Sequence, residues 1–313
     1  MSSPLSPQQI DDVLPRALLD RLDVLRGRQL VVEELGGGLT NRNFKLSTPD
    51  GTRFVLRLSS NESTELSVNR AHEHANSRLA ADAGVGAPVY GWLEDANVLL
   101  IGYLEGTTLD DSSFDSPGIL PRVAQSLRQL HEGPQFVNDF NMFAIQAGYQ
   151  STVIDQGWRL PAGYLELNEH LPRIRAALEV LAEPSVPCNN DLLAGNFIDD
   201  GSKIWLIDYE YSGNNDPCFE IGNIWSENHL SEEQLEELIE AYWGRHRPSK
   251  VARAKLWGLM SQYGWTLWAS IQDATSRIDF DFWTWGLEKF DRAVATFHSP
   301  ELSDLLDAVQ RPD

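Results

Sequence analysis

The sequence predicts an α+β protein of two lobes, a small β-rich lobe followed by a larger lobe made mainly of helices. The chain has 313 residues, enough for two hydrophobic cores. Short strand-like runs fill much of its first third, whereas apolar residues recur at helical spacing over 117–182 and from 231 onward. We place a connector at residues 102–107, which divides the chain into lobes 1–101 and 108–313.

The first lobe begins with an amphipathic helix predicted over residues 7–25. Its apolar side chains share one face: Ile10, Val13, Leu14, Leu18, Leu19 and Leu22. Three strand-like runs follow, QLVVEEL, NRNFKLST and RFVLRLSS, and the turn TPDG predicts a hairpin between the last two. Residues 65–83 return to a helical pattern, and APVYGWLED and NVLLIGYL read as two more strands. In the second lobe, a strand-rich insertion separates the two helical stretches.

Composition restricts the class of partner. With 46 acidic and 25 basic residues the formal net charge is −21, which argues against nucleic acid and membrane partners, since nucleic acid and anionic membranes both require basic patches. The charge suits a small cationic substrate, and it equally suits an acidic surface that maintains solubility. No apolar run approaches the roughly 18 residues of a membrane span, and the N-terminal residues lack the features of a secretory signal.

The chain contains two cysteines, Cys188 and Cys218. Two are too few for a disulfide framework or a zinc site. We therefore expect both to be reduced in a cytoplasmic protein, with Cys188 as a packing residue. The sequence makes no prediction of the oligomeric state.

The segment VPCNNDLLAGNFIDDGSKIWLIDYEYSG, residues 186–213, carries the clearest chemical pattern. Asp191 and Asn196 lie on one loop, and Asp208 ends the short apolar strand that follows. Phosphoryl transfer requires a carboxylate at the acceptor hydroxyl and oxygen ligands for Mg²⁺. The spacing matches a kinase catalytic loop, in which a base is followed by a metal-binding amide and a strand-terminal carboxylate. The alternative is a loop whose Asp and Asn cap turns or helix ends.

NNDLLAGNF and IWLIDYEYSGNNDPCFEIGN resemble the choline/ethanolamine kinases, within the wider aminoglycoside-phosphotransferase-like superfamily. The resemblance covers nearly the whole chain and implies a protein-kinase-like two-lobe fold, with ATP and Mg²⁺ as cofactors. It implies that Asp191 is the catalytic base and that Asn196 and Asp208 bind metal, with Glu210 as a ligand for a second metal ion. By family position, the Gly102 carbonyl and the Leu104 amide contact adenine.

GGGLTNRNFKL resembles the phosphate-covering turn of the same family. Glycines let the backbone approach a phosphate closely, and the polar side chains after them add donors. The candidate residues are Gly36, Gly37, Gly38, Thr40, Asn41 and Asn43. A plain hairpin turn is the alternative.

FVLRL resembles the third strand of the family, where Arg57 takes the position of the nucleotide-binding cation. Glu73 matches the helical glutamate that pairs with this cation. A buried guanidinium needs an anionic partner, which Glu73 and nucleotide phosphates would supply. A surface ion pair at the strand edge is the alternative.

One position departs from the family pattern. Asn189 stands two residues before Asp191, where the family usually has a histidine that serves mainly as an architectural hydrogen-bonding residue. An asparagine can also donate and accept, so we expect activity to survive. A nucleotide-binding pseudokinase is the alternative.

The acceptor pocket is predicted from residues 264–293, which hold four of the ten tryptophans. Trp265 and Trp268 share a helix face, and Phe282 and Trp285 repeat their spacing. Periodicity alone favours a helix-pair core. The resemblance instead assigns these four residues to an aromatic pocket for a trimethylammonium group.

The family commonly has tyrosine at the last two of these positions. A quaternary cation binds aromatic faces, whereas a primary ammonium requires hydrogen-bond acceptors. The missing hydroxyls thus favour choline over ethanolamine, while Glu227 matches an acidic pocket position that serves either cation. The main prediction is a choline kinase. Kinases of the same fold that act on ethanolamine, an aminoglycoside or another amino alcohol are the alternatives.

Overall fold

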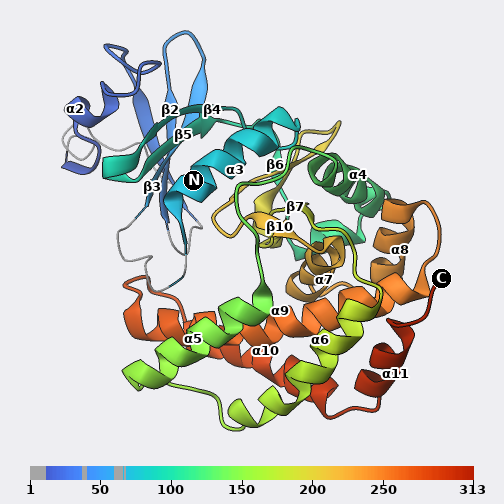
Figure 1. Cartoon of the computed structure of the whole chain (residues 1–313). Coiled ribbons are helices and arrows are strands. Elements are labelled where there is room, and N and C mark those ends of the chain that lie inside the picture. The colour runs from blue at the N-terminus through green and yellow to red at the C-terminus, as the bar shows by residue number, and fades with distance from the viewer. Residues whose placement is uncertain (1–11, 37–40, 60–65, 67) are drawn as a thin grey trace.

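The computed structural model describes residues 12–36, 41–59, 66 and 68–313, and its first part is an antiparallel sheet (Figure 1). The strand order is β1-β2-β3-β5-β4. The bounds are β1 Val31–Leu35, β2 Asn41–Ser47, β3 Arg53–Ser59, β4 Val89–Leu93 and β5 Val98–Gly102. All five predicted strand runs form strands, and their inward side chains, such as Phe44, Leu56 and Leu100, build one core. The predicted connector 102–107 begins at Gly102, the last residue of β5, and its bounds stay a prediction.

The helix predicted over residues 7–25 is interrupted and shortened in its described part, where only residues 12–13 and 16–19 are helical. Pro15 has an extended backbone, with φ −52° and ψ 137°, and the helix α2 spans only Arg16–Leu19 before a series of turns. Proline lacks the N–H group that a helix interior requires. The predicted apolar face nevertheless packs on the sheet, because Leu14, Leu19 and Leu22 are buried there.

The helix α3, Arg70–Asp82, begins later than the predicted residue 65. Asn69 has an extended backbone, and its side chain accepts hydrogen bonds from the backbone N–H groups of Ala71 and His72. This is an N-cap, and it fixes where the helix starts. Glu73 lies in the first turn, on the side facing the sheet strand β3.

The larger part of the chain is mainly helical, as predicted. Its helices are α4 Ile119–His131, α5 Met142–Gln156, α6 Leu171–Val180, α7 Pro217–Glu227, α8 Glu232–Trp243, α9 Pro248–Thr275, α10 Phe282–Phe297 and α11 Glu301–Ala308. The 28-residue helix α9 is buried along most of its length and packs against α5, α7, α10 and α11 (Figure 1). A helix buried on all sides forms the centre of a core. Among the described helices, none is long and apolar enough to cross a membrane.

The insertion between the helical stretches contains short strands, and also a helix that the sequence analysis missed. The strands are β7 Val186–Cys188, β8 Phe197–Asp199, β9 Ile204–Leu206 and β10 Gly213–Asn215, with β6 Thr107–Thr108 pairing with β8. The missed helix is α7. Its start is signalled by Asp216 as N-cap and Pro217 at the first helical position. Because nearly every residue of α7 is buried, its sequence shows no alternation between an apolar and a polar face.

A close crossing of α7 and α9 positions the end of α7. A Cβ atom added at Gly222 would lie 2.1 Å from the carbonyl oxygen of Ala254 and 2.8 Å from the amide nitrogen of Gly258. Only glycine fits at such a distance between two backbones. The crossing holds Glu227, the last residue of α7, beside α10.

Candidate active site

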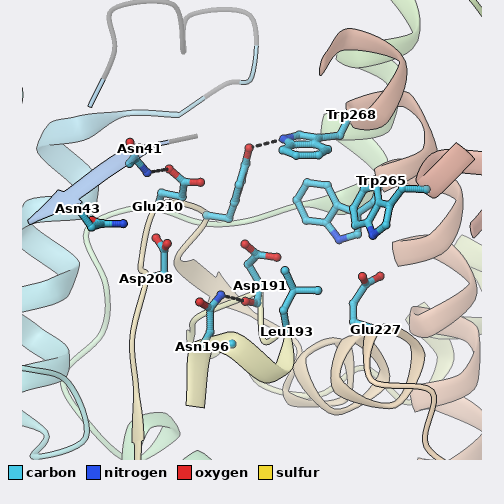
Figure 2. Close-up of a pocket in the computed structure, with 13 residues that line it drawn as sticks. Asn41, Asn43, Asp191, Leu193, Asn196, Asp208, Glu210, Glu227, Trp265 and Trp268 are labelled. Atoms are coloured by element: carbon cyan, nitrogen blue, oxygen red, sulfur yellow. Dashed lines mark hydrogen bonds between the residues drawn. The ribbon is translucent and has the colours of Figure 1, made fainter. Parts of the chain in front are cut away.

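Ten of the predicted site residues line one cavity of about 230 Å³ (Figure 2). The cavity lies where β2 faces the segment 186–216 and the helices α9 and α10. The predicted residues on its wall are Asn41, Asn43, Asp191, Asn196, Asp208, Glu210, Glu227, Trp265, Trp268 and Trp285. Leu193, Gly195 and Tyr211 complete the lining.

Hydrogen bonds from neighbouring residues hold the loop around Asp191. The Asn196 side-chain nitrogen donates to the Asp191 carbonyl oxygen at 2.7 Å, which closes the loop and turns this asparagine toward the cavity. The next amide, that of Leu192, donates to the Asn223 side chain at 2.9 Å. Asp191 and Asn196 therefore do more than cap turns, since both side chains line the cavity.

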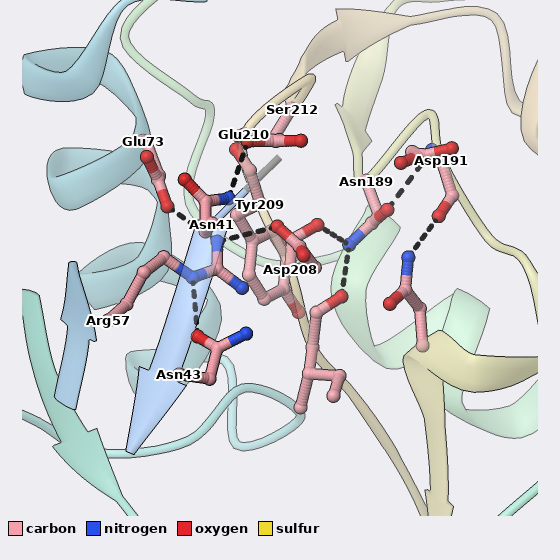
Figure 3. Close-up of polar contacts among 12 residues, drawn as sticks. Asn41, Asn43, Arg57, Glu73, Asn189, Asp191, Asp208, Tyr209, Glu210 and Ser212 are labelled. Atoms are coloured by element: carbon pink, nitrogen blue, oxygen red, sulfur yellow. Dashed lines mark hydrogen bonds and ion pairs between the residues drawn. The ribbon is translucent and has the colours of Figure 1, made fainter. Parts of the chain in front are cut away.

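Asn189 connects this loop to Asp208 (Figure 3). The sequence analysis placed Asp208 at a strand end, whereas β9 ends at Leu206, two residues earlier. The Asn189 side-chain nitrogen donates to the carbonyl oxygens of Ile207 and Asp208 at 3.0 and 2.9 Å, and its side-chain oxygen accepts from the Asp191 amide at 3.1 Å. The residue is fully buried. Asn189 thus performs the architectural hydrogen bonding expected at this position.

Asp208 adopts a left-handed backbone conformation with φ +63°. This conformation is uncommon for a residue other than glycine, although Asp and Asn tolerate it better than most. It brings the carboxylate 2.6 Å from the guanidinium of Arg57. Local strain of this kind is often found where a functional side chain must point in a defined direction.

Buried ion pairs join the sheet to the loop that follows Asp208. Arg57 on β3 donates to Glu73 on α3 at 2.7 Å as well as to Asp208 (Figure 3). Arg70 donates to Glu73 at 2.7 Å and to Glu210 at 3.0 Å. Arg57 is only 7% exposed, so it is not a surface ion-pair residue. Burial alone would lower the pKa of Arg57. The negative charges of Asp208 and Glu73 raise it by more than burial lowers it, so the net shift is upward.

The charges in this region leave an excess of negative charge. The carboxylates of Glu73, Asp208 and Glu210 pair with the two guanidinium groups of Arg57 and Arg70. Asp191 adds a fourth carboxylate near Asp208 and Glu210, so the balance is two negative charges. Burial, and then the charges of Asp208 and Glu210, raise the pKa of Asp191. Burial, and then Asp208 and Glu73, also raise the pKa of Glu210. A divalent cation would offset this excess, and the carboxylate and amide oxygens on the wall are the hard ligands that Mg²⁺ prefers.

The opposite end of the cavity is aromatic. Trp265 meets Tyr211 edge-on with ring centroids 5.0 Å apart, and Trp268 and Trp285 are 5.5 Å apart. The Trp268 indole N–H donates to the Tyr211 hydroxyl at 2.7 Å. Trp265 and Trp268 also belong to the helical core. These two residues therefore belong to the core and also line the cavity. That the cavity binds a trimethylammonium group stays a prediction.

Glu227 lies at this aromatic end and is paired with a lysine. Its Oε2 accepts from the Nζ of Lys289, a buried residue of α10. Its Oε1 is buried and has no hydrogen-bond partner in the described part of the chain. Glu227 therefore lies on the cavity wall and carries one buried, unpartnered carboxylate oxygen.

Several predicted residues do not line this cavity. Phe282 is 2% exposed and packs edge-on against Trp268 at 5.8 Å, so it supports that ring from outside. Gly102 and Leu104 lie elsewhere. Gly37, Gly38 and Thr40 are outside the described residues.

A second, smaller cavity shares Asp208 with the first. It measures about 20 Å³ and is lined by Arg57, Ser77, Ala87, Leu99, Ile101, Ile207, Asp208 and Tyr209. Most of these side chains are apolar, and they come from both β5 and the strand end before Asp208. A volume of this size holds about one water molecule.

Sequence reasoning did not single out Tyr211, which lines the cavity, or Lys289, which pairs with Glu227. Tyr211 lies three residues after Asp208, in the same quoted segment. Lys289 lies four residues after Trp285, a spacing that places both on one face of a helix. A search for charged residues one turn from each predicted pocket residue would have found Lys289.

Comparison with known proteins gives matches over most of the chain. Residues 31–256 match the family described as "Phosphotransferase enzyme family". Protein LicA of Haemophilus influenzae is 28% identical over 271 residues, which cover 82% of this chain and 77% of that protein. A probable ethanolamine kinase of Arabidopsis thaliana is 28% identical over 284 residues, covering 80% and 75%.

Solved structures also match this chain over most of its length. The crystal structure of a choline/ethanolamine kinase family protein from Mesorhizobium loti superposes with a TM-score of 0.83 at 33% identity, covering 96% of this chain and 98% of that one. LicA in complex with AMP superposes with a TM-score of 0.73 at 22% identity, covering 90% and 97%, which indicates a shared fold.

Proposed function

This chain belongs to the choline/ethanolamine kinase family of phosphotransferase enzymes, and from that premise we propose that it phosphorylates the hydroxyl group of choline, with ATP as donor and Mg²⁺ as metal. The observation that carries the proposal is the composition of one cavity. Asp191 lies between the oxygen-rich end around Asp208 and the aromatic end around Trp265 (Figure 2). A small amino alcohol could place its cation against the rings and its hydroxyl at Asp191.

Asp191 would accept the proton of the acceptor hydroxyl. A carboxylate in the reach of the attacking oxygen serves as a general base, and its raised pKa brings it closer to the range in which it can hold that proton. The side chain lies on a loop that Asn189, Asn196 and Asn223 fix in position. Asp191 is thus oriented before the substrate binds.

Asp208, Asn196 and Glu210 are the residues that would hold Mg²⁺, which supplies charge neutralisation at the transferring phosphate. Arg57 would pair with a phosphate as well as with Glu73, because a guanidinium offers five N–H donors. Asn41 and Asn43 lie on the same side of the cavity, on the strand after the glycine-rich turn.

The aromatic end favours choline over ethanolamine as the acceptor. Trp265, Trp268 and Trp285 present ring faces or edges to a small volume, and a quaternary ammonium gains about 0.5–2 kcal/mol from each well-placed ring. A primary ammonium would need three hydrogen-bond acceptors. An aminoglycoside carries several hydroxyl and amino groups and would be expected to use a broader polar surface than this one.

Asn189 supports an active enzyme over a pseudokinase. Its three hydrogen bonds join the Asp191 loop to the backbone at Asp208, so the substitution leaves both carboxylates at the cavity. The loss of histidine therefore removes no group that the proposed reaction needs.

The proposal is tested by measuring ADP release with Mg·ATP and choline, ethanolamine, thiamine or kanamycin as the acceptor. We expect the highest kcat/KM with choline, a lower value with ethanolamine and no turnover with kanamycin. Stronger turnover with kanamycin or thiamine would reject the acceptor assignment. Binding of Mg·ATP without turnover of any acceptor would favour a pseudokinase.

A further inference from the structure

A buried lysine neutralises the only carboxylate at the aromatic end of the described cavity wall. Lys289 is 3% exposed and Glu227 is 7% exposed, and they form a direct ion pair through Glu227 Oε2. Lys289 itself is not part of the cavity wall, whereas Glu227 is. The lysine therefore contacts the carboxylate from behind the wall.

Lys289 also contacts the aromatic wall. Its Nζ lies 3.9 Å from the centroid of the Trp285 ring, one helical turn earlier on α10. The ammonium group thus uses one carboxylate oxygen of Glu227 and interacts with one pocket ring. Glu227 Oε1 remains buried and unpartnered in the described part of the chain.

We propose that Lys289 is a specificity-determining residue that makes the acceptor pocket select methylated ammonium groups over primary ones. The inference rests on the proposed function, because it concerns which amino alcohol occupies the same site. Lys289 acts through Glu227, by neutralising its charge and occupying one of its two oxygens. It need not touch the substrate.

The physical reason is the number of acceptors left for the substrate. A primary ammonium brings three N–H donors into the pocket, and each donor that stays unpaired after losing its water costs free energy. With Lys289 in place, Oε2 of Glu227 is occupied, Oε1 is buried, and the pair carries no net charge. A quaternary ammonium has no N–H donor, so it loses nothing here and still gains from the rings.

Lys289→Met tests this inference, because it frees Glu227 Oε2 and removes the opposing charge. We expect the ratio of kcat/KM for ethanolamine to kcat/KM for choline to rise about tenfold, the value of one additional charge-assisted hydrogen bond. Both substrates are measured on the same preparation. The ratio is therefore independent of the fraction of enzyme that is folded, which matters because breaking a buried ion pair is destabilising.

Three further variants separate specificity from stability. The double variant Glu227→Gln with Lys289→Met should not show the rise, because no carboxylate charge remains. Lys289→Arg should keep the ratio of the unmodified protein. Lys255→Met is the matched control, since Lys255 is a buried lysine paired with Glu232 and Glu301 outside this cavity. It should lower the melting temperature without changing the ratio.

Calorimetric binding of each amine to the unmodified protein and to Lys289→Met provides a second measurement that does not depend on turnover. An unchanged ratio in Lys289→Met, with choline still phosphorylated by the unmodified protein, would overturn the inference alone. If the unmodified protein neither binds nor phosphorylates choline or ethanolamine, the proposed function and this inference are both rejected.

Discussion

The two ends of the cavity are built in different ways. The oxygen-rich end comes mainly from the loops of one short segment, together with Asn41 and Asn43 of β2. It is held by hydrogen bonds and ion pairs around Asp191 and Asp208. The aromatic end comes from the helices α9 and α10, together with Tyr211, and it is held by the packing of a hydrophobic core. The structure of the oxygen-rich end depends on charged groups and on the direction of their hydrogen bonds. The structure of the aromatic end depends on how side chains of given volume and shape pack together.

This difference indicates how each end should respond to substitution. At the oxygen-rich end, a change of one atom removes a charge or a metal ligand, so turnover should fall while the fold persists. At the aromatic end, rings serve both the core and the pocket, so substitution should weaken the binding of one substrate and also reduce stability. Each experiment below tests one side of this comparison.

The largest effect is expected for Asp208→Ala. It removes the carboxylate that would hold Mg²⁺ at the phosphates, and turnover should fall roughly 10⁴-fold. Calorimetry should show that Mg²⁺ no longer strengthens ATP binding. Asp199→Ala is a matched control, because Asp199 also pairs with an arginine, Arg122, but lies outside the cavity. Unchanged Mg·ATP affinity in Asp208→Ala would contradict the metal assignment.

Asp191→Asn should reduce kcat by about 10³-fold, in the range of general-base contributions. The replacement keeps the size of the side chain and removes its ability to accept the proton. Affinity for Mg·ATP should be unchanged, because the base acts on the acceptor and not on the nucleotide. Single-turnover kinetics with saturating choline would measure the chemical step. A kcat near that of the unmodified protein would remove Asp191 from this role.

Asn189→Ala should reduce stability by about 1–3 kcal/mol, because three buried backbone groups lose their partner. It should also lower kcat, since these bonds hold the Asp191 loop against the backbone at Asp208. Asn214→Ala is a matched control. Asn214 is buried and also accepts from one backbone amide and donates to two backbone carbonyls, those of Phe136 and Asn138, away from the loop.

The two asparagine variants should therefore lose similar stability, as measured by urea denaturation. Only Asn189→Ala should lose kcat measured on the folded protein. Equal kcat in the two variants would mean that Asn189 contributes to folding and not to the geometry of the oxygen-rich end.

The sequence predicted the oxygen-rich end better than the aromatic end, for a physical reason. Asp191, Asn196 and Asp208 lie within one segment, where local turns and a short strand determine their relative positions. Spacing along the chain is then a guide to spacing in space. The partners from other elements, such as Arg70 on Glu210, depend on how the sheet meets the helical part and have no local signal.

At the aromatic end, periodicity identified a shared helix face but not which side of each ring meets the cavity. Phe282 and Trp285 have the same spacing as Trp265 and Trp268, yet Phe282 packs behind Trp268. Lys289 was missed because its partner, Glu227, comes from another helix. The helix α7, which carries Glu227, was missed because its uniform burial leaves no amphipathic pattern.

The smallest effects are expected at the aromatic wall itself. If Trp265, Trp268 and Trp285 surround a quaternary ammonium, each single leucine replacement should weaken choline binding by about 0.5–2 kcal/mol, a factor of roughly 2 to 30. Leucine keeps much of the apolar bulk, so the loss is chiefly the electrostatic face of the ring. The affinity for ATP should stay the same, because the nucleotide is expected at the oxygen-rich end.

Trp283→Leu is the matched control for these three variants. Trp283 lies two residues before Trp285 on α10 but outside the cavity, and its ring faces the guanidinium of Arg159 at 3.8 Å. Its replacement should leave the choline Michaelis constant unchanged. Trp268→Leu should have the largest effect on stability of the four, because Trp268 is buried, loses its hydrogen bond to Tyr211 and supports both Phe282 and Trp285. A lower melting temperature with an unchanged choline constant in all three wall variants would leave the tryptophans with a core function alone. The acceptor would then have to be sought with the remaining polar groups of the cavity.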